Sequence, residues 1–130
     1  MHVHSYDYAI VRVVPRVERE EFLNAGVILS CPAAEFLEAR IELDEARLTA
    51  LAPGVDVTAV RTHLRSLAVV AAGGAAAGPI GKLTQRERFH WLVAPCSTMI
   101  QTSAVHTGRC TDPAAAIEHL LATMVRSVVE

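Results

Sequence analysis

The sequence has little cysteine, and none of it is arranged as a disulfide framework or a metal-binding motif. Its three cysteines, Cys31, Cys96 and Cys110, are odd in number, far apart and outside any Cys-x-x-Cys pair. This usage is typical of reduced thiols in a cytosol rather than of a secreted, disulfide-stabilised chain. We therefore expect each cysteine to act as a small buried apolar side chain.

The sequence also lacks a long hydrophobic run. The longest uncharged stretch, residues 66–81, contains Pro79 and is too short and too rich in glycine to cross a bilayer. The first residues, Met1 to Asp7, contain no basic segment ahead of an apolar run, so they do not resemble a secretory signal. We expect a cytoplasmic protein with no membrane partner.

Neither charge sign is in large excess, since the formal net charge is -2 and the predicted pI is 6.3. Domains that bind nucleic acid are usually far more basic, and no such motif is present, so we expect no nucleic-acid partner. The charges are nevertheless uneven: residues 1–52 carry five arginines and nine acids (-4), whereas residues 61–110 carry six basic residues and one acid (+5). This contrast predicts either an anion-facing surface or two faces that attract each other within the fold.

What the chain does contain is enough apolar sequence for a core. With 130 residues, 52% hydrophobic and 20% charged, it is not a disordered chain and fits one globular domain over residues 1–130. Apolar periodicity predicts strands over residues 8–14, 24–31, 36–43 and 89–93, and a polar, half-exposed strand over 98–107. Gly26, inside the second strand, predicts a bulge or a close approach of two backbones.

Helix-start signals separate these strands. Asp44, Asp56 and the pair Asp112-Pro113 are N-cap signals for three helices, and Thr84 with Glu87 is a capping-box pattern for a single helical turn. The order of elements predicts an α+β fold, with an antiparallel or mixed sheet of about five strands packed against two to three helices.

Recognisable catalytic, cofactor and metal motifs are absent. Gly81-Lys82 resembles the end of a phosphate-binding loop, but the positions that require glycine and Ser or Thr hold Ala76 and Leu83. Histidine and cysteine spacing gives no metal site, and no nucleophile stands in a known catalytic signature. We assign no catalytic residue, no metal and no cofactor, and the sequence favours a protein that is not an enzyme.

The most informative single residue is Arg12, which shares a face of an apolar strand with Tyr8 and Ile10. A cation among such neighbours is costly unless it is paired, so we expect it to meet Glu20 or Glu21, or else an anionic ligand. Trp91, one of few large side chains, is expected in the core. The candidate binding residues are Arg12, Asn24, Arg88, His90, Gln101, Ser103, His106 and Thr107.

Several blocks of sequence carry a family resemblance. They are residues 8–15 (YAIVRVVP), 20–29 (EEFLNAGVIL), 87–92 (ERFHWL), Ser97-Thr98, and His106-Thr107-Gly108 followed by Asp112-Pro113. Together they resemble the bacterial family catalogued as domain of unknown function 3037. The resemblance implies a short protein with no assigned reaction, encoded in some genomes beside a HipA-type kinase-like protein. It therefore supplies no catalytic residues and suggests an accessory role.

These observations predict a non-catalytic accessory or protein-interaction module that binds a protein partner or a second copy of itself, with the HipA-type protein as one candidate partner. The alternative is a small enzyme or small-anion-binding protein in which Arg12, Arg88, His90 and His106 converge on a cleft. The two differ in geometry, because only the second requires all four side chains to line one hollow.

Overall fold

A five-stranded antiparallel sheet forms the centre of the structure, a computed structural model that describes residues 2–95 and 98–127. The strands are β1 (His4–Val13), β2 (Leu23–Cys31), β3 (Phe36–Ile41), β4 (Ile100–Thr102) and β5 (His106–Cys110). β2 lies between β3 and β1, and the other side of β1 pairs with β5 along its first half and with β4 along its second. The expected α+β class is confirmed.

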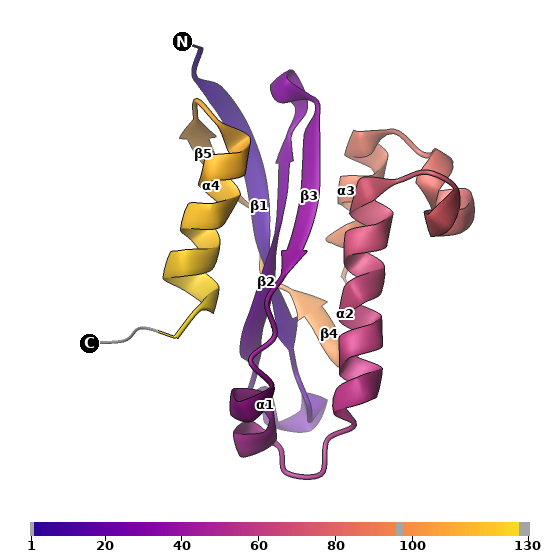
Figure 1. Cartoon of the computed structure of the whole chain (residues 1–130), viewed down its shortest axis with the longest axis vertical. Helices are drawn as coiled ribbons and strands as arrows, with labels where there is room; N and C mark the ends of the chain where they lie inside the picture. Colours follow the sequence, from indigo (N-terminus) through magenta and orange to yellow (C-terminus); the bar gives the residue numbers. More distant parts are fainter. Residues whose placement is uncertain (1, 96–97, 128–130) are drawn as a thin grey trace.

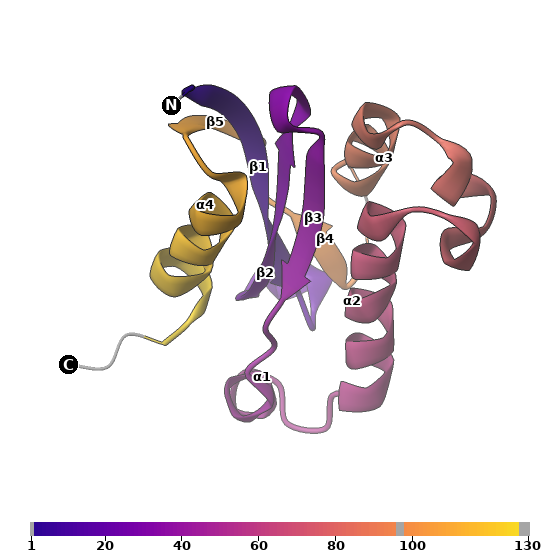
Figure 2. The same ribbon diagram turned by 45° about the horizontal axis from the view of Figure 1, so that its top comes forward.

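Helices cover both faces of this sheet (Figures 1 and 2). One face packs against α1 (Glu45–Leu51), α2 (Val57–Ala72) and α3 (Gln85–Leu92); the other packs against α4 (Pro113–Leu120) and the π-helical turn η4 (Leu121–Val125) that continues it. Three 3-10 helices, η1 (Val17–Arg19), η2 (Pro32–Ala34) and η3 (Ala75–Lys82), lie in connections. We call the two sides the α2 face and the α4 face.

The apolar run of β2 is explained by burial on both sides. Ala25 and Ile28 join the cluster on the α2 face, while Val27 and Leu29 join the one on the α4 face. A strand covered on two faces needs apolar residues at successive positions rather than alternation. β3, at the edge, buries Leu37 and Ala39 and leaves the intervening residues partly exposed, as its alternation predicts.

The helix-start signals are confirmed. The carboxylates of Asp44, Asp56 and Asp112 each accept a backbone N–H in the first turn, at 3.0–3.1 Å. Gly26 also behaves as expected. The β1–β2 register shifts beside it, and a Cβ placed there would lie 2.7 Å from the Arg40 carbonyl oxygen.

The predicted strand over residues 89–93 is wrong, because this segment is the second half of α3. The Thr84–Glu87 capping box forms, but it starts a helix of eight residues rather than one turn. Phe89 and Leu92, three residues apart, point into the core, and Trp91 between them is 48% exposed, not in the core as expected. A short run of aromatic and apolar residues fits both the two-residue period of a strand and the 3.6-residue period of a helix. Here, packing against α2 and β2 favours the helix.

The predicted strand over residues 98–107 is interrupted between β4 and β5. Ile100 pairs with Val13 whereas His106 pairs with Tyr8, so one extra residue enters between them and the side chains exchange faces. Ser103 stabilises this bulge: it is buried, its Oγ accepts the Ile10 N–H at 2.9 Å, and its own N–H donates to the Ile10 carbonyl. His106 and Ile100 thus lie on opposite faces, contrary to the continuous alternation predicted.

No single helix in the described part of the chain is long and apolar enough to cross a membrane. Only α2 and η3 taken together have that length and composition, and they are bent by 60° relative to each other.

Candidate functional site

Arg12 lies on the α4 face of β1 and is partly buried. Its guanidinium carbon is 4.2 Å from the centre of the Phe22 ring, a cation–π contact. No carboxylate in residues 2–95 and 98–127 forms an ion pair with it, and Glu21 pairs with Arg19 instead. The expected pairing of Arg12 with Glu20 or Glu21 is therefore wrong.

Two of the other candidate residues flank Arg12 across the sheet. Asn24 on β2 and Gln101 on β4 are its direct cross-strand partners, so the three side chains form one row on the α4 face. The Asn24 amide donates to the Met124 carbonyl at 2.9 Å, while Gln101 donates to the Thr98 carbonyl. The neighbours of the guanidinium in this row are thus neutral amides.

Exposed apolar side chains complete this site. Phe22, beneath the guanidinium, is 46% exposed, and Met124, whose carbonyl Asn24 holds, is 45% exposed. We call these five residues, Arg12, Phe22, Asn24, Gln101 and Met124, the Arg12 patch. Phe22 and Met124 were missed from the sequence, although an aromatic residue two positions before Asn24, just ahead of β2, was a usable signal.

Asn24 also has a structural role in this patch. Its amide and the Arg47 guanidinium bind the Met124 and Val125 carbonyls, the last acceptors of η4, which the helix itself leaves unpaired. Buried Arg12 Nε and Asn24 Oδ1 have no hydrogen-bond partner among the described residues. Asn24 thus ties the patch to η4, while the terminal nitrogens of Arg12 form no hydrogen bond to a described residue.

The structure separates Arg88 from Arg12. Arg88 is buried on the α2 face, where its terminal nitrogens donate to the carbonyls of Leu83 and Ala71. Its guanidinium covers Gly73, which has a φ of +75°, and joins the end of α2 to the start of α3. This placement makes Arg88 a structural cation, solvated by carbonyls rather than by a ligand.

The histidines do not join Arg12 either. His90 is exposed on α3, 6.0 Å from the Phe89 ring, whereas His106 is exposed on β5, 5.4 Å from the Tyr8 ring on the α4 face. None of the five main hollows among the described residues is lined by Arg12, Arg88, His90 or His106.

Thr107 belongs to a polar cluster that sequence reasoning did not find. Its hydroxyl donates to Asp7 at 3.0 Å, and Arg86 binds both Asp7, at 2.7 Å, and the Ser30 hydroxyl, at 3.1 Å. These contacts join α3 to three strands on the α2 face. Because Asp7 and Arg86 neutralise each other, we interpret the cluster as a structural link between α3 and the sheet.

The charge contrast between chain segments is partly used inside the fold. Arg61 pairs with Glu45 and Arg86 with Asp7, in each case joining the basic segment to the acidic one. Arg65, Lys82 and Arg109 form no ion pair with a described residue. Attraction within the fold therefore accounts for part of the contrast.

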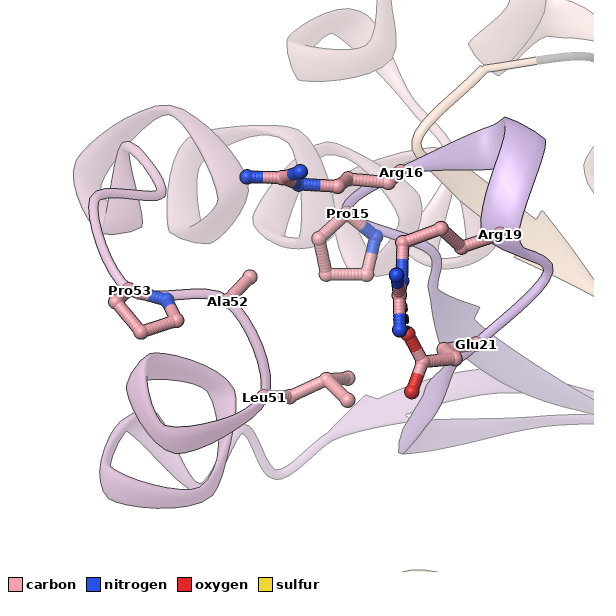
Figure 3. A pocket seen from close by; sticks show the side chains of 7 residues that line it. All are labelled: Pro15, Arg16, Arg19, Glu21, Leu51, Ala52 and Pro53. Carbon is pink, nitrogen blue, oxygen red and sulfur yellow. Dashed lines mark hydrogen bonds and ion pairs between the residues drawn. The ribbon is translucent and has the colours of Figure 1, made fainter.

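A hollow of about 170 Å³ lies beside η1 and the α1–α2 connection (Figure 3). Arg19 reaches Glu21 on one side of it, Arg16 extends away across Pro15, and Leu51, Ala52 and Pro53 form the opposite wall (Figure 3). Arg19 and Glu21 neutralise each other here, whereas Arg16 forms no ion pair with a described residue.

Metal and thiol chemistry find little support. Within residues 2–95 and 98–127, no three His, Cys, Asp or Glu side chains gather as metal ligands do. Cys31 is buried, and burial, together with the neighbouring Cys31, raises the pKa of the Cys110 thiol. Cys96 and Ser97 lie outside the described residues.

Comparison with known proteins returns one family. The model described as "Protein of unknown function (DUF3037)" matches residues 8–125, nearly the whole chain. No curated protein and no solved structure matches the chain significantly.

Proposed function

We propose that this chain, which belongs to the DUF3037 family of proteins of unknown function, is a non-catalytic interaction module that binds a carboxylate-bearing segment of a partner protein at the Arg12 patch. The observation that carries the proposal is the Arg12 guanidinium, which is partly buried, seated on Phe22 and without an ion pair to any described residue. The chain would act as a bacterial accessory protein in the cytoplasm.

The chemistry of the patch selects an acidic ligand with an apolar neighbour. A guanidinium presents parallel N–H donors that match the two oxygens of a carboxylate, and the Phe22 ring beneath fixes its plane. Phe22 and Met124 offer exposed aromatic and thioether surface beside it. Arg, Met and aromatic residues are those enriched in protein interfaces, where they supply most of the binding energy.

The partner to test first is the HipA-type kinase-like protein that the family resemblance implies. The two purified proteins would be mixed and examined by size-exclusion chromatography and isothermal titration calorimetry. We expect a stoichiometric complex that Arg12→Met weakens by about thirtyfold or more, since breaking a buried charge pair at an interface costs about 2 kcal/mol or more.

Arg65→Met is the matched control. Arg65 lies on α2, forms no ion pair with a described residue, and its loss changes the net charge by the same amount. Equal weakening by both variants would indicate general charge attraction and overturn the assignment of the site. Absence of a complex with the HipA-type protein would reject that partner, and an Arg12-dependent complex with another acidic protein would keep the site.

The same guanidinium supports one alternative, a small-anion-binding protein. Calorimetry with phosphate and with citrate distinguishes the two functions. Saturable heat that Arg12→Met abolishes, without any protein complex, would favour the alternative. The enzymatic version of that alternative also needs His90, His106 and Arg88 near the anion, and they lie on other parts of the surface or in the core.

A further inference from the structure

A second surface, on the outer edge of β4, has a different character from the Arg12 patch. β4 pairs with β1 on one side only and lies at the margin of the sheet, next to α2 (Figures 1 and 2). Two adjoining hollows, of about 280 and 350 Å³, follow this edge. They share Ala94, Pro95, Gln101 and Thr102, so they form one elongated depression, which we call the β4 groove.

The backbone of β4 offers unused hydrogen-bonding groups to this groove. The N–H groups of Val14 and Ser103 bond to the carbonyls of Met99 and Ile10, which fixes the register. In that register Gln101 turns its own N–H and carbonyl towards β1, so those of Ile100 and Thr102 point to the open edge. The Ile100 carbonyl accepts the Thr98 hydroxyl, whereas Thr102 has no backbone hydrogen bond to a described residue.

One of the two hollows has mainly apolar walls, and the other is lined by apolar and polar groups in similar measure. One hollow is lined by Leu67 of α2, Trp91 and Leu92 of α3, and Ile100 of β4, and the other reaches Val105. Trp91 and Val105 are 48% and 45% exposed, and together with Phe22 and Met124 they make up four of the six large apolar side chains exposed on the described chain. An edge with free backbone donors beside an apolar hollow is the arrangement that binds peptides by strand addition.

We infer that the β4 groove binds an extended segment of a partner protein, which pairs with the open edge of β4 and places one aliphatic side chain against Trp91. The backbone groups of Thr102 require a ligand that carries both an amide N–H and a carbonyl, which a lipid or a simple anion lacks. The apolar walls beside Trp91 require a side chain without charge. This inference does not depend on Arg12 itself, although the β4 groove shares Gln101 with the Arg12 patch.

The probe is an acetylated, amidated octapeptide in which threonine alternates with valine or leucine between terminal lysines. Trp91 is the only tryptophan in the chain, so its fluorescence reports on the groove directly. We expect the peptide to shift the emission to shorter wavelength in a saturable manner. The same peptide with N-methyl groups along one edge keeps its side chains but cannot pair as a strand, and it should bind at least about tenfold more weakly.

Two protein variants test the contact from the other side. Thr102→Pro removes an N–H that faces away from β1, a position at which an edge strand tolerates proline, whereas Thr102→Ala keeps that N–H. With both variants folded by circular dichroism, we expect only Thr102→Pro to lose the peptide, and Arg12→Met to bind it normally. If Thr102→Pro does not fold, the N-methylated peptide still tests whether binding requires backbone hydrogen bonds along β4.

Three results would overturn the inference. They are an unchanged tryptophan spectrum, equal binding of the N-methylated peptide, and equal binding by a folded Thr102→Pro variant. A dimer of the free chain that Thr102→Pro disperses would replace the partner segment by a second copy and overturn the proposed occupant.

Discussion

Replacement of Arg88 by methionine should destabilise the protein strongly while leaving the Arg12 patch unaffected. Arg88 is 8% exposed and donates to the Leu83 and Ala71 carbonyls, so it connects the segment before α3 to the end of α2, beside the Gly74–Gly81 backbone hydrogen bond. Methionine has a similar length and no hydrogen-bond donors. The variant therefore leaves both carbonyls without this partner and does not open a large cavity.

The size of the effect follows from these contacts. A hydrogen bond from a charged group contributes about 1.5–3 kcal/mol, and the bond to Ala71, at 3.4 Å, belongs to the weak end of that range. Removing the desolvated cation returns part of the loss. We therefore expect the free energy of unfolding to fall by about 2–3 kcal/mol, a large share of the stability of a domain of this size.

Gly73 provides an independent measurement of the same contact. Its φ of +75° is strained for any residue with a side chain, and a Cβ there would lie 2.9 Å from the Arg88 guanidinium carbon. Gly73→Ala should cost about 1–3 kcal/mol in the parent protein. In the Arg88→Met background the clash is relieved and only the backbone strain remains, so the two costs should fall short of additivity by about 1 kcal/mol.

Urea unfolding monitored by circular dichroism gives all four free energies of this cycle. A loss below about 0.5 kcal/mol in Arg88→Met, which is the range of an ordinary surface substitution, would refute the structural role of Arg88. So would strict additivity with Gly73→Ala. A folded Arg88→Met variant that no longer binds the Arg12-dependent partner would instead restore Arg88 to the binding surface.

Two further outcomes are expected. Ser103→Ala removes the buried acceptor of the Ile10 N–H, so unfolding should become easier by about 1–2 kcal/mol, whereas Ser103→Thr, which keeps the hydroxyl, should recover part of the loss in the same urea titration. Hydrogen bonding to Arg126 holds the pKa of Glu42 below its usual value, so this stabilisation is present above the ordinary glutamate pKa and is lost as the pH falls through the lowered one. Arg126→Met should therefore lower the melting temperature slightly at pH 7, and a difference that does not shrink as the pH falls below the ordinary glutamate pKa would contradict this assignment.

The parts of the fold that the sequence predicts are those that local chemistry decides. Asp44, Asp56 and Asp112 cap helices because a carboxylate satisfies free N–H groups within its own turn, whatever lies further away. Gly26 marks a bulge because only glycine tolerates the neighbouring backbone there. Such signals are complete within a few residues, and the structure confirms them.

The errors occur where distant contacts decide. Residues 89–93 satisfy the pattern of a strand. Phe89, however, is only 1% exposed, in a core that also contains residues from α2 and four strands, and that packing requires a helix. The exchange of faces before His106 results from a bulge held by Ile10, 93 residues from Ser103. Neither contact leaves a trace in the local periodicity.

The candidate site shows the same division. The alternation of residues 8–14 predicts that Arg12 lies on an apolar strand face. Its position in a row with Asn24 and Gln101, however, depends on the registers of two strand pairs. Which cation lacks an acid depends on partners far along the chain, as Arg86 shows by pairing with Asp7 across 79 residues. The sequence therefore identifies the candidate cations, and the fold decides which of them form ion pairs.

The position of Arg12 within the acidic part of the chain strengthens its assignment as a recognition residue. Residues 1–52 carry nine acids and five arginines. Arg19 and Arg40 each pair with an acid two residues away, whereas Arg12, Arg16 and Arg47 form no ion pair with a described residue. Of these three, Arg12 lies in a row of the sheet whose other members are amides, with its guanidinium over the Phe22 ring. A guanidinium kept partly desolvated and unpaired costs stability. A carboxylate on a bound partner would neutralise the guanidinium and recover this stability. An acid of the protein's own beside Arg12 would compete with that carboxylate for the same donors.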